Sequence, residues 1–125
     1  MKLTLEHIEN HYFVTVTADA AFTNKDFVKV LEDIFSLEYW KPGMCVLFDN
    51  RKLDLRETSF ENVKTAVEDF VKSNERFGDG KIAFLMKKGS DYGQGRQFQI
   101  MTEEKTSTNL QIFVNKEVAI RWLSA

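Results

Sequence analysis

The sequence has few of the residues that cross-link or interrupt a chain: one cysteine, one proline and six glycines among 125 residues. A single cysteine, Cys45, cannot form a disulfide within the chain, which is typical of a reducing compartment, and we expect a cytoplasmic protein. The longest apolar runs are about five residues long, far shorter than a membrane span requires. Charged residues stand too near the first residue for a signal peptide, so we expect no targeting segment.

Neither sign of charge dominates the sequence. Seventeen Lys and Arg residues stand against nineteen Asp and Glu residues, which gives a net charge of −2, and no segment concentrates the basic ones. Because nucleic-acid-binding proteins usually carry a basic patch, we expect no nucleic-acid partner. The two histidines, His7 and His11, are spaced across a predicted hairpin rather than along a helix, and no Ser-His-Asp, Cys-His or metal-ligand set is present. We therefore expect no metal, no cofactor and no enzymatic activity.

Apolar residues in regular patterns are what the sequence does contain, among them eleven phenylalanines. Alternating residues predict strands over 3–8 and 12–18 around a turn at Asn10-His11, and apolar segments predict strands over 44–48, 82–86 and 110–114. Apolar stripes at helical spacing predict helices from residue 23 or 24, where Thr23 with Asp26 makes a cap-like start, from about residue 59, over 91–105, and after a cap at Asn115. Six phenylalanines fall on the predicted core faces: Phe27, Phe35, Phe48, Phe70, Phe84 and Phe113.

This order, β-β-α-β-α-β-α-β-α, predicts one α/β domain over residues 1–125. Helices that alternate with apolar strands imply parallel crossovers, so we expect a mixed five-stranded sheet with helices packed on its faces and the N-terminal hairpin at one edge. Ligand sites in such sheets lie beyond the carboxyl ends of the strands. The loops 49–58 and 87–95 are therefore the candidate site.

The first of these loops ends in two hydroxyl residues, Thr58 and Ser59. The segment 58–61 fits a capping box in which Thr58 caps the following helix and Glu61 reaches back, which is the favoured interpretation. The alternative is a functional hydroxyl, such as a phospho-acceptor, at a helix N-terminus that favours a phosphoryl group. Asp49, at the start of the loop, is either an acidic site residue or, as is favoured, a polar residue that ends a strand.

The second loop contains three glycines, Gly89, Gly93 and Gly95. Their spacing matches neither the dinucleotide fingerprint nor the P-loop, so they indicate close helix–sheet packing, a hinge, or at most a generic anion site. Arg96 stands in the first turns of a helix, where the helix dipole disfavours a cation, and we expect it to bind a carboxylate of the fold or of a ligand.

Several segments resemble the SpoIIAA-like proteins, small bacterial relatives of the STAS domain that are also similar to lipid-carrying Sec14-like folds. The similar segments, in chain order, are Pro42-Gly43 ahead of residues 46–49, residues 80–83, the aromatic and glycine segment 92–98, and the final strand and helix at 112–123. The order and spacing of these segments carry the resemblance, which covers nearly the whole chain. It implies a single STAS-type domain with a non-catalytic regulatory or carrier role.

Anti-anti-sigma proteins of the STAS type switch partners when a serine is phosphorylated in an Asp-Ser-Ser/Thr-Gly loop. In the matching position this sequence has Glu57-Thr58-Ser59-Phe60, without the Asp and the Gly. The resemblance instead favours binding of an apolar small molecule or lipid, or contact with a protein partner or the surface of a membrane. The alternative is a phosphorylation-switched partner protein, or a small enzyme that uses Thr58 or Ser59 with Asp49.

An apolar pocket has a physical basis in the helix over 91–105, which has few apolar residues and two glycines near its start. If this helix moves, we expect a pocket lined by the residues around the two loops: Asp49, Phe60, Tyr92, Arg96, Phe98 and Met101. The alternative is that the apolar members of this set simply fill the core. Exposed aromatic residues, for example Tyr39, Trp40 or Trp122, are candidates for the face of a homodimer.

Overall fold

The computed structural model describes residues 2–8 and 11–125, and for His7, Ile8 and His11 it describes the backbone alone. The turn expected at Asn10-His11 and the spacing of the two histidine side chains therefore fall outside the described residues. The elements follow in the order β1 (Lys2–Ile8), β2 (His11–Thr17), α1 (Asn24–Phe35), β3 (Cys45–Asp49), α2 (Phe60–Lys72), α3 (Asn74–Phe77), β4 (Lys81–Leu85), α4 (Ser90–Glu103), β5 (Asn109–Phe113) and α5 (Lys116–Ser124). The predicted order is confirmed, with the short helix α3 as an addition.

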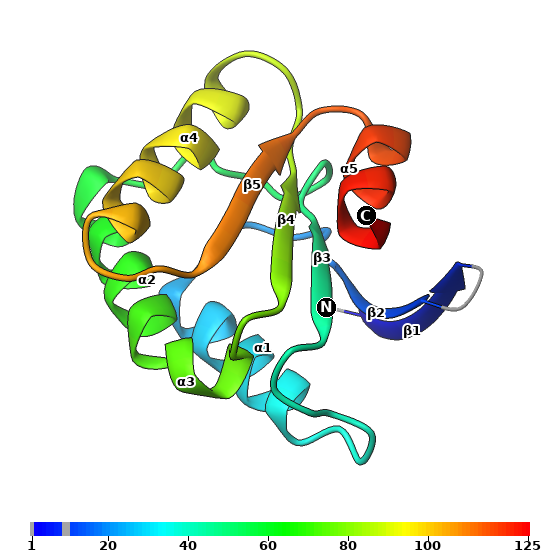
Figure 1. Ribbon diagram of the computed structural model, residues 1–125. Helices are drawn as coiled ribbons and strands as arrows, with labels where there is room; N and C mark the ends of the chain where they lie inside the picture. The colour runs from blue at the N-terminus through cyan, green and yellow to red at the C-terminus, as the bar shows by residue number, and fades with distance from the viewer. Residues whose placement is uncertain (1, 9–10) are drawn as a thin grey trace.

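The five strands form one mixed sheet in the order β1-β2-β3-β4-β5. The hairpin strands β1 and β2 are antiparallel, whereas β2, β3, β4 and β5 run parallel to one another. Figure 1 shows the hairpin curving away from the rest of the sheet at one edge, with β5 at the other. The sheet is therefore the one that the alternation of strands and helices predicts.

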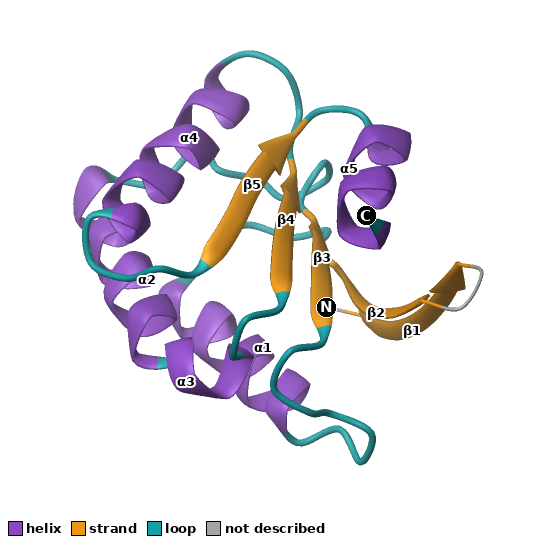
Figure 2. Ribbon diagram, in the orientation of Figure 1, coloured by secondary structure: helices purple, strands orange, loops and turns teal. Residues whose placement is uncertain are grey.

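Helices cover both faces of the sheet, but unequally. Alternate strand residues such as Val16, Phe48 and Phe84 pack in one cluster with α1, α2 and α4, while Leu47 and Leu85 pack in a second cluster with α5 alone. Figure 2 shows α5 in front of the sheet, apart from the other helices. Because β3 and β4 are buried on both faces, their sequences are continuous apolar runs rather than alternating ones.

Two helices begin at the caps that the sequence predicts. The Thr23 side chain accepts a hydrogen bond from the Asp26 amide at the start of α1, and the Asn115 side chain accepts one from the Val118 amide at the start of α5. Each cap satisfies an amide that has no partner within its helix. These two caps fix where the flanking loops end.

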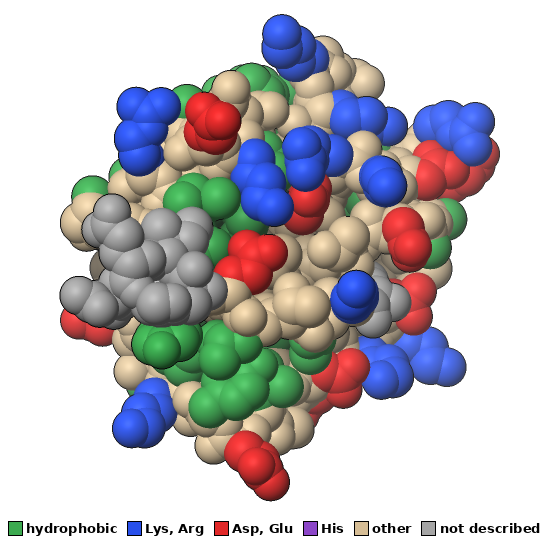
Figure 3. Space-filling view, turned by 90° about the vertical axis from the view of Figure 1, so that its right-hand side faces the viewer, with side chains coloured by type: hydrophobic (Ala, Val, Ile, Leu, Met, Phe, Trp, Pro, Cys, Tyr) green, Lys and Arg blue, Asp and Glu red, His purple; other side chains and the backbone are tan. Residues whose placement is uncertain are grey.

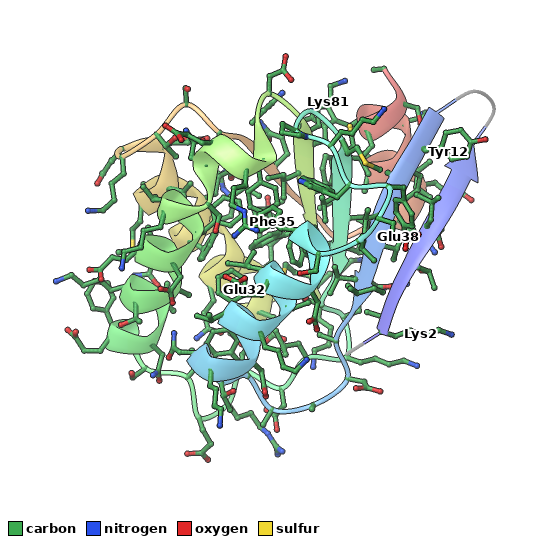
Figure 4. The ribbon with its side chains drawn as sticks, turned by 90° about the horizontal axis from the view of Figure 1, so that it is seen from below. Lys2, Tyr12, Glu32, Phe35, Glu38 and Lys81 are labelled. Atoms are coloured by element: carbon green, nitrogen blue, oxygen red, sulfur yellow. The ribbon has the colours of Figure 1, made fainter. Side chains whose placement is uncertain are left out.

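Two of the three residues expected on a dimer face pack against other aromatic rings instead, Trp40 in the cluster with α1 and α2 and Trp122 in the cluster with α5. The Trp40 ring lies 5.5 Å from that of Phe35 and its indole N–H donates to the Arg76 carbonyl at 3.2 Å, while Trp122 packs on Phe113. Both tryptophans are half-buried, and only Tyr39 of the three is exposed. Seen from below, Phe35 lies among the helices, and Tyr12 lies on the hairpin at the rim of the molecule (Figure 4).

Candidate apolar binding site

An apolar cavity of about 80 Å³ lies on the α1, α2 and α4 side of the sheet, at the carboxyl ends of β2, β3 and β4. Its walls come from strand ends, from the loops that follow them, and from the three helices. The lining residues are Val16, Ala18, Phe22, Phe27, Val30, Phe48, Asn50, Leu53, Leu55, Thr58, Val63, Ala66, Phe84, Met86, Gln94, Gly95 and Phe98. This is the end of the sheet where open α/β folds bind ligands.

The strand period determines which residues reach the cavity. Val16, Phe48 and Phe84 are register partners along β2, β3 and β4, so their side chains point to the same face of the sheet. Phe98 of α4 closes this wall, with its ring 5.1 Å from that of Phe84 and 6.2 Å from that of Phe27. The cavity is thus the place where the Phe-rich core does not fully close.

Three of the lining side chains are polar: Asn50, Thr58 and Gln94. All three are half-buried, as are Phe22 and Leu55, so these residues mark the side on which the cavity approaches the surface. The Asn50 amide lies 3.7 Å from the Met86 sulfur. A ligand in this cavity would place an apolar group among the rings and a polar group beside these three side chains.

Asp49 does not line this cavity. It follows Leu47 by two residues, so it faces the α5 side of the sheet, and the positive charge of Lys116 in α5 contributes to lowering its pKa. The main cause of the lowered pKa is the pair of hydrogen bonds from the Arg51 guanidinium, at 2.9 and 2.8 Å, which outweighs the opposing effect of burial. Asp49 is therefore an ion-paired residue that ends a strand, which corrects its expected place in the pocket.

A second Asp–Arg pair follows in the same loop. The Arg56 guanidinium donates to both carboxylate oxygens of Asp54 at 3.0 and 2.9 Å, which lowers the pKa of Asp54 to about 2. The Asp54 backbone also bonds to the loop ahead of α1, through its amide to the Ala20 carbonyl and its carbonyl to the Phe22 amide. The two pairs therefore support the shape of the loop that borders the cavity.

The two hydroxyls have different roles from those expected. Ser59, rather than Thr58, caps α2, and Asn62, rather than Glu61, completes the capping box by accepting from the Ser59 amide at 3.0 Å. The cap is displaced by one residue because the helix begins at Phe60. Thr58 is thereby free of the cap, and its side chain lines the cavity.

Of the six residues expected to line a pocket, only Phe98 lines this cavity. Phe60 is 57% exposed at the first position of α2, and Met101 packs on the edge of the core next to the cavity. Tyr92 lies outside, in a separate surface groove, and the Arg96 guanidinium donates to the Gln99 side chain rather than to a carboxylate. The cavity thus takes most of its walls from residues other than the expected ones.

The residues that sequence reasoning missed come from the ends of strands and from loops. The alternation in β2 already placed Val16 on the face of Val14, which was a usable signal. Phe22, Leu53 and Leu55 gave no such signal, because they lie in irregular segments whose path depends on the bridge between Ala21 and Asp54.

The helix α4 is held against the sheet by contacts other than an apolar stripe. A side chain at Gly95 would place its Cβ 3.1 Å from the Met86 Cγ and 3.2 Å from an Ile112 methyl, so the absence of a side chain permits close approach. The buried Gln99 amide donates to the Leu110 carbonyl of β5 at 2.7 Å. These contacts hold α4 against the sheet although few of its residues are apolar.

Charged side chains border the cavity without lining it, as in the ion pairs of Arg51 with Asp49 and of Arg56 with Asp54. Figure 3 shows Lys and Arg side chains gathered toward the end of the molecule where the strands end, on the side that carries α5.

Within residues 2–8 and 11–125, no group of three or more His, Cys, Asp or Glu side chains is placed to hold a metal ion. No helix in that same part of the chain is both long and apolar enough to cross a bilayer.

Comparisons with known proteins identify the fold. No protein-family model and no curated protein matches the sequence. Among solved structures, the chain is similar to an uncharacterized protein of the DUF3478 family from Shewanella loihica PV-4, which is described as having a SpoIIAA-like fold. The two share 16% sequence identity with a TM-score of 0.66, over 98% of this chain and 92% of that one. The chain is therefore a single mixed α/β unit with the SpoIIAA-like fold.

Proposed function

We propose that this protein is a non-catalytic carrier or regulatory module of the cytoplasm that binds the apolar part of a small molecule or lipid. The observation that carries the proposal is the cavity at the carboxyl ends of the parallel strands, whose walls are apolar except for Asn50, Thr58 and Gln94. Ligand pockets typically combine such apolar walls with a few polar groups. The buried free thiol of Cys45 is consistent with a reducing compartment.

The size of the cavity limits the ligand. At about 80 Å³ it has about half the volume of an engineered cavity of ~150 Å³ that accepts benzene. The cavity as it stands therefore suits a short aliphatic segment rather than a ring. A longer chain would need Phe22 or Leu55, which are half-buried in loops, to move aside.

The alternative of a hydroxyl nucleophile or phosphoryl switch next to Asp49 is less well supported. Asp49 and Thr58 face opposite sides of the sheet, and the Asp49 carboxylate is already paired with Arg51. Ser59 is engaged in the cap of α2 through both its amide and its hydroxyl. The Asp49 carboxylate therefore does not meet the hydroxyl of Thr58 or Ser59 at one site.

A titration with straight-chain alkanols, from ethanol to hexanol, tests the proposal. We expect saturable changes in the NMR signals of Val63, Met86 and Phe98, with affinity rising along the series until the chain fills the cavity. Ala66→Leu replaces a methyl group in the cavity wall with a larger side chain that fills part of the cavity. It should abolish these changes while the protein stays folded.

The matched control is Ala20→Leu, which adds the same atoms at an exposed alanine that does not line the cavity. This variant should bind the alkanols as the wild type does. Signals that shift linearly without saturation, or an unchanged affinity in Ala66→Leu, would show that the cavity is not a binding site.

A further inference from the structure

A groove of about 450 Å³ crosses the end of the edge strand β5, between the first turns of α4 and α5. It is separate from the apolar cavity, which lies beneath α4. Its lining residues are Lys88, Gly89, Tyr92, Ile112, Phe113, Val114, Asn115 and Val118. Tyr92, Val114 and Val118 are all exposed, so apolar side chains that usually avoid water face it here.

The backbone of β5 has unpaired groups along this groove. The Phe113 carbonyl accepts a hydrogen bond from the Met86 amide at 2.8 Å, so Phe113 points its backbone groups toward β4. Since these groups alternate in direction along a parallel edge strand, those of Leu110, Ile112 and Val114 point away from the sheet. Gln99 covers the Leu110 carbonyl. Among the described residues no hydrogen bond reaches the outward backbone groups of Ile112 or of Val114, the residue that follows the strand; Ile112 as a whole is 8% exposed and Val114 39%.

The charge of the groove has one sign. Lys88 is the one charged side chain among the lining residues, and no described carboxylate forms an ion pair with it. The neighbouring Lys87 Nζ lies 3.6 Å from the buried Oδ2 of Asp91, which makes an ion pair without a hydrogen bond. A ligand in the groove therefore meets an open strand edge, apolar side chains and one free cation.

We propose that this groove docks an extended segment of a partner protein, which adds a strand to β5 beside Ile112 and Val114. Alternate apolar side chains of the segment would pack on Tyr92, Val114 and Val118, and a carboxylate of the segment would meet Lys88. Main-chain bonds provide the affinity in this mode of recognition, and side-chain contacts provide the specificity.

A partner of different sequence fits this surface better than a second copy of the chain. A two-fold interface brings the same patch of both copies together, so it must be complementary to itself. A patch with a lysine and no carboxylate is not self-complementary. The open edge is also short, because Gln99 occupies its beginning.

Hydrogen exchange and a peptide probe test the proposal. In the free protein the amides of Ile112 and Val114 should exchange fast and that of Phe113 slowly. The probe is an acetylated heptapeptide of alternating valine and threonine with a glutamate next to its last residue. Binding of this peptide should slow exchange at Ile112 and Val114, and the same peptide with lysine in place of glutamate should bind about fivefold more weakly.

Two perturbations separate strand addition from nonspecific adsorption. Val114→Pro removes an outward amide for which the described part of the fold shows no partner, and it should weaken peptide binding about tenfold, more than Val114→Ala, which keeps the amide and removes only the side-chain contact. If the proline variant is unfolded, a peptide N-methylated at the alternate residues that face β5 removes the bonds of the opposite direction, which run from peptide amides to outward carbonyls of β5. It should bind about tenfold more weakly as well.

Three results would overturn the proposal. The first is the absence of saturable binding by the glutamate peptide. The second is equal binding of the normal and N-methylated peptides. The third is protection of Ile112 and Val114 in a concentration-dependent dimer without peptide, which would assign the edge to a second copy of the chain.

Discussion

Two glycines in α4 should respond in opposite ways to the same substitution. A Cβ at Gly93 would meet no atom within 4 Å, whereas a Cβ at Gly95 would stand 3.1 Å from Met86 and 3.2 Å from Ile112. Both residues lie inside the helix and neither has a positive φ. Gly93→Ala and Gly95→Ala therefore make the same local change in two different surroundings.

The helical preference for alanine over glycine is about 1 kcal/mol at an interior position. Gly93→Ala should gain this amount, which corresponds to a rise in Tm of about 3–5 °C for a domain of this size. At Gly95 the neighbours must give way by a few tenths of an ångström, and the cost of such overpacking is about 1–3 kcal/mol. The net effect of Gly95→Ala should therefore lie between zero and a loss of about 2 kcal/mol.

Urea denaturation followed by circular dichroism measures both free energies of unfolding under one condition. The expected result is a more stable Gly93→Ala protein and a Gly95→Ala protein that is no more stable than the wild type. If the two variants gain stability equally, α4 does not approach the sheet as closely as the structure places it, and the account of how this helix is held is wrong.

Four further substitutions test the loops and α4. Arg56→Gln should raise the pKa of Asp54 from about 2 toward 3.8, as measured by NMR titration of the carboxyl carbon. Because the folded-state pKa of Asp54 is lowered, its contribution to stability is present above pH 3.8 and is lost as the pH falls through about 2. Ser59→Ala should cost about 1 kcal/mol by removing the cap of α2, whereas Thr58→Ala should change stability by less than about 0.5 kcal/mol; equal losses would contradict the assignment of the cap. Gln99→Met should cost about 1–3 kcal/mol in thermal denaturation because it leaves a buried β5 carbonyl without its donor, and an unchanged Tm would argue against that bond.

Most of the fold could be predicted from the sequence because its elements carry strong periodic signals. The apolar runs of β3 and β4 are buried where the pattern places them, and so are most residues in the stripes of α1 and α2, apart from Phe60, which is 57% exposed. Thr23 and Asn115 cap the expected helices. The short helix α3 gave no independent signal, since it continues α2 after a break at Ser73. Burial of Phe77 in α3 was missed for the same reason.

The site was predictable in position but not in composition. The rule that ligands bind beyond the carboxyl ends of parallel strands led to the end of the sheet at which the cavity lies, and Phe98, one of the expected residues, lines that cavity. Asp49 was misplaced because the face of a strand's last residue depends on register, which sequence alone does not give. The exact start of α2 could not be predicted either, since Thr58 and Ser59 are both good caps and only the packing of the loop selects between them.

Native mass spectrometry of the protein, purified under gentle conditions from the cells that produce it, is the most direct test of the central claim that the cavity under α4 binds an apolar ligand. The account predicts a small apolar molecule that remains bound to the wild type and to Ala20→Leu, and that is absent from Ala66→Leu. A wild-type protein that carries no adduct and also shows no saturable alkanol binding would contradict the claim, as would an adduct that persists in Ala66→Leu.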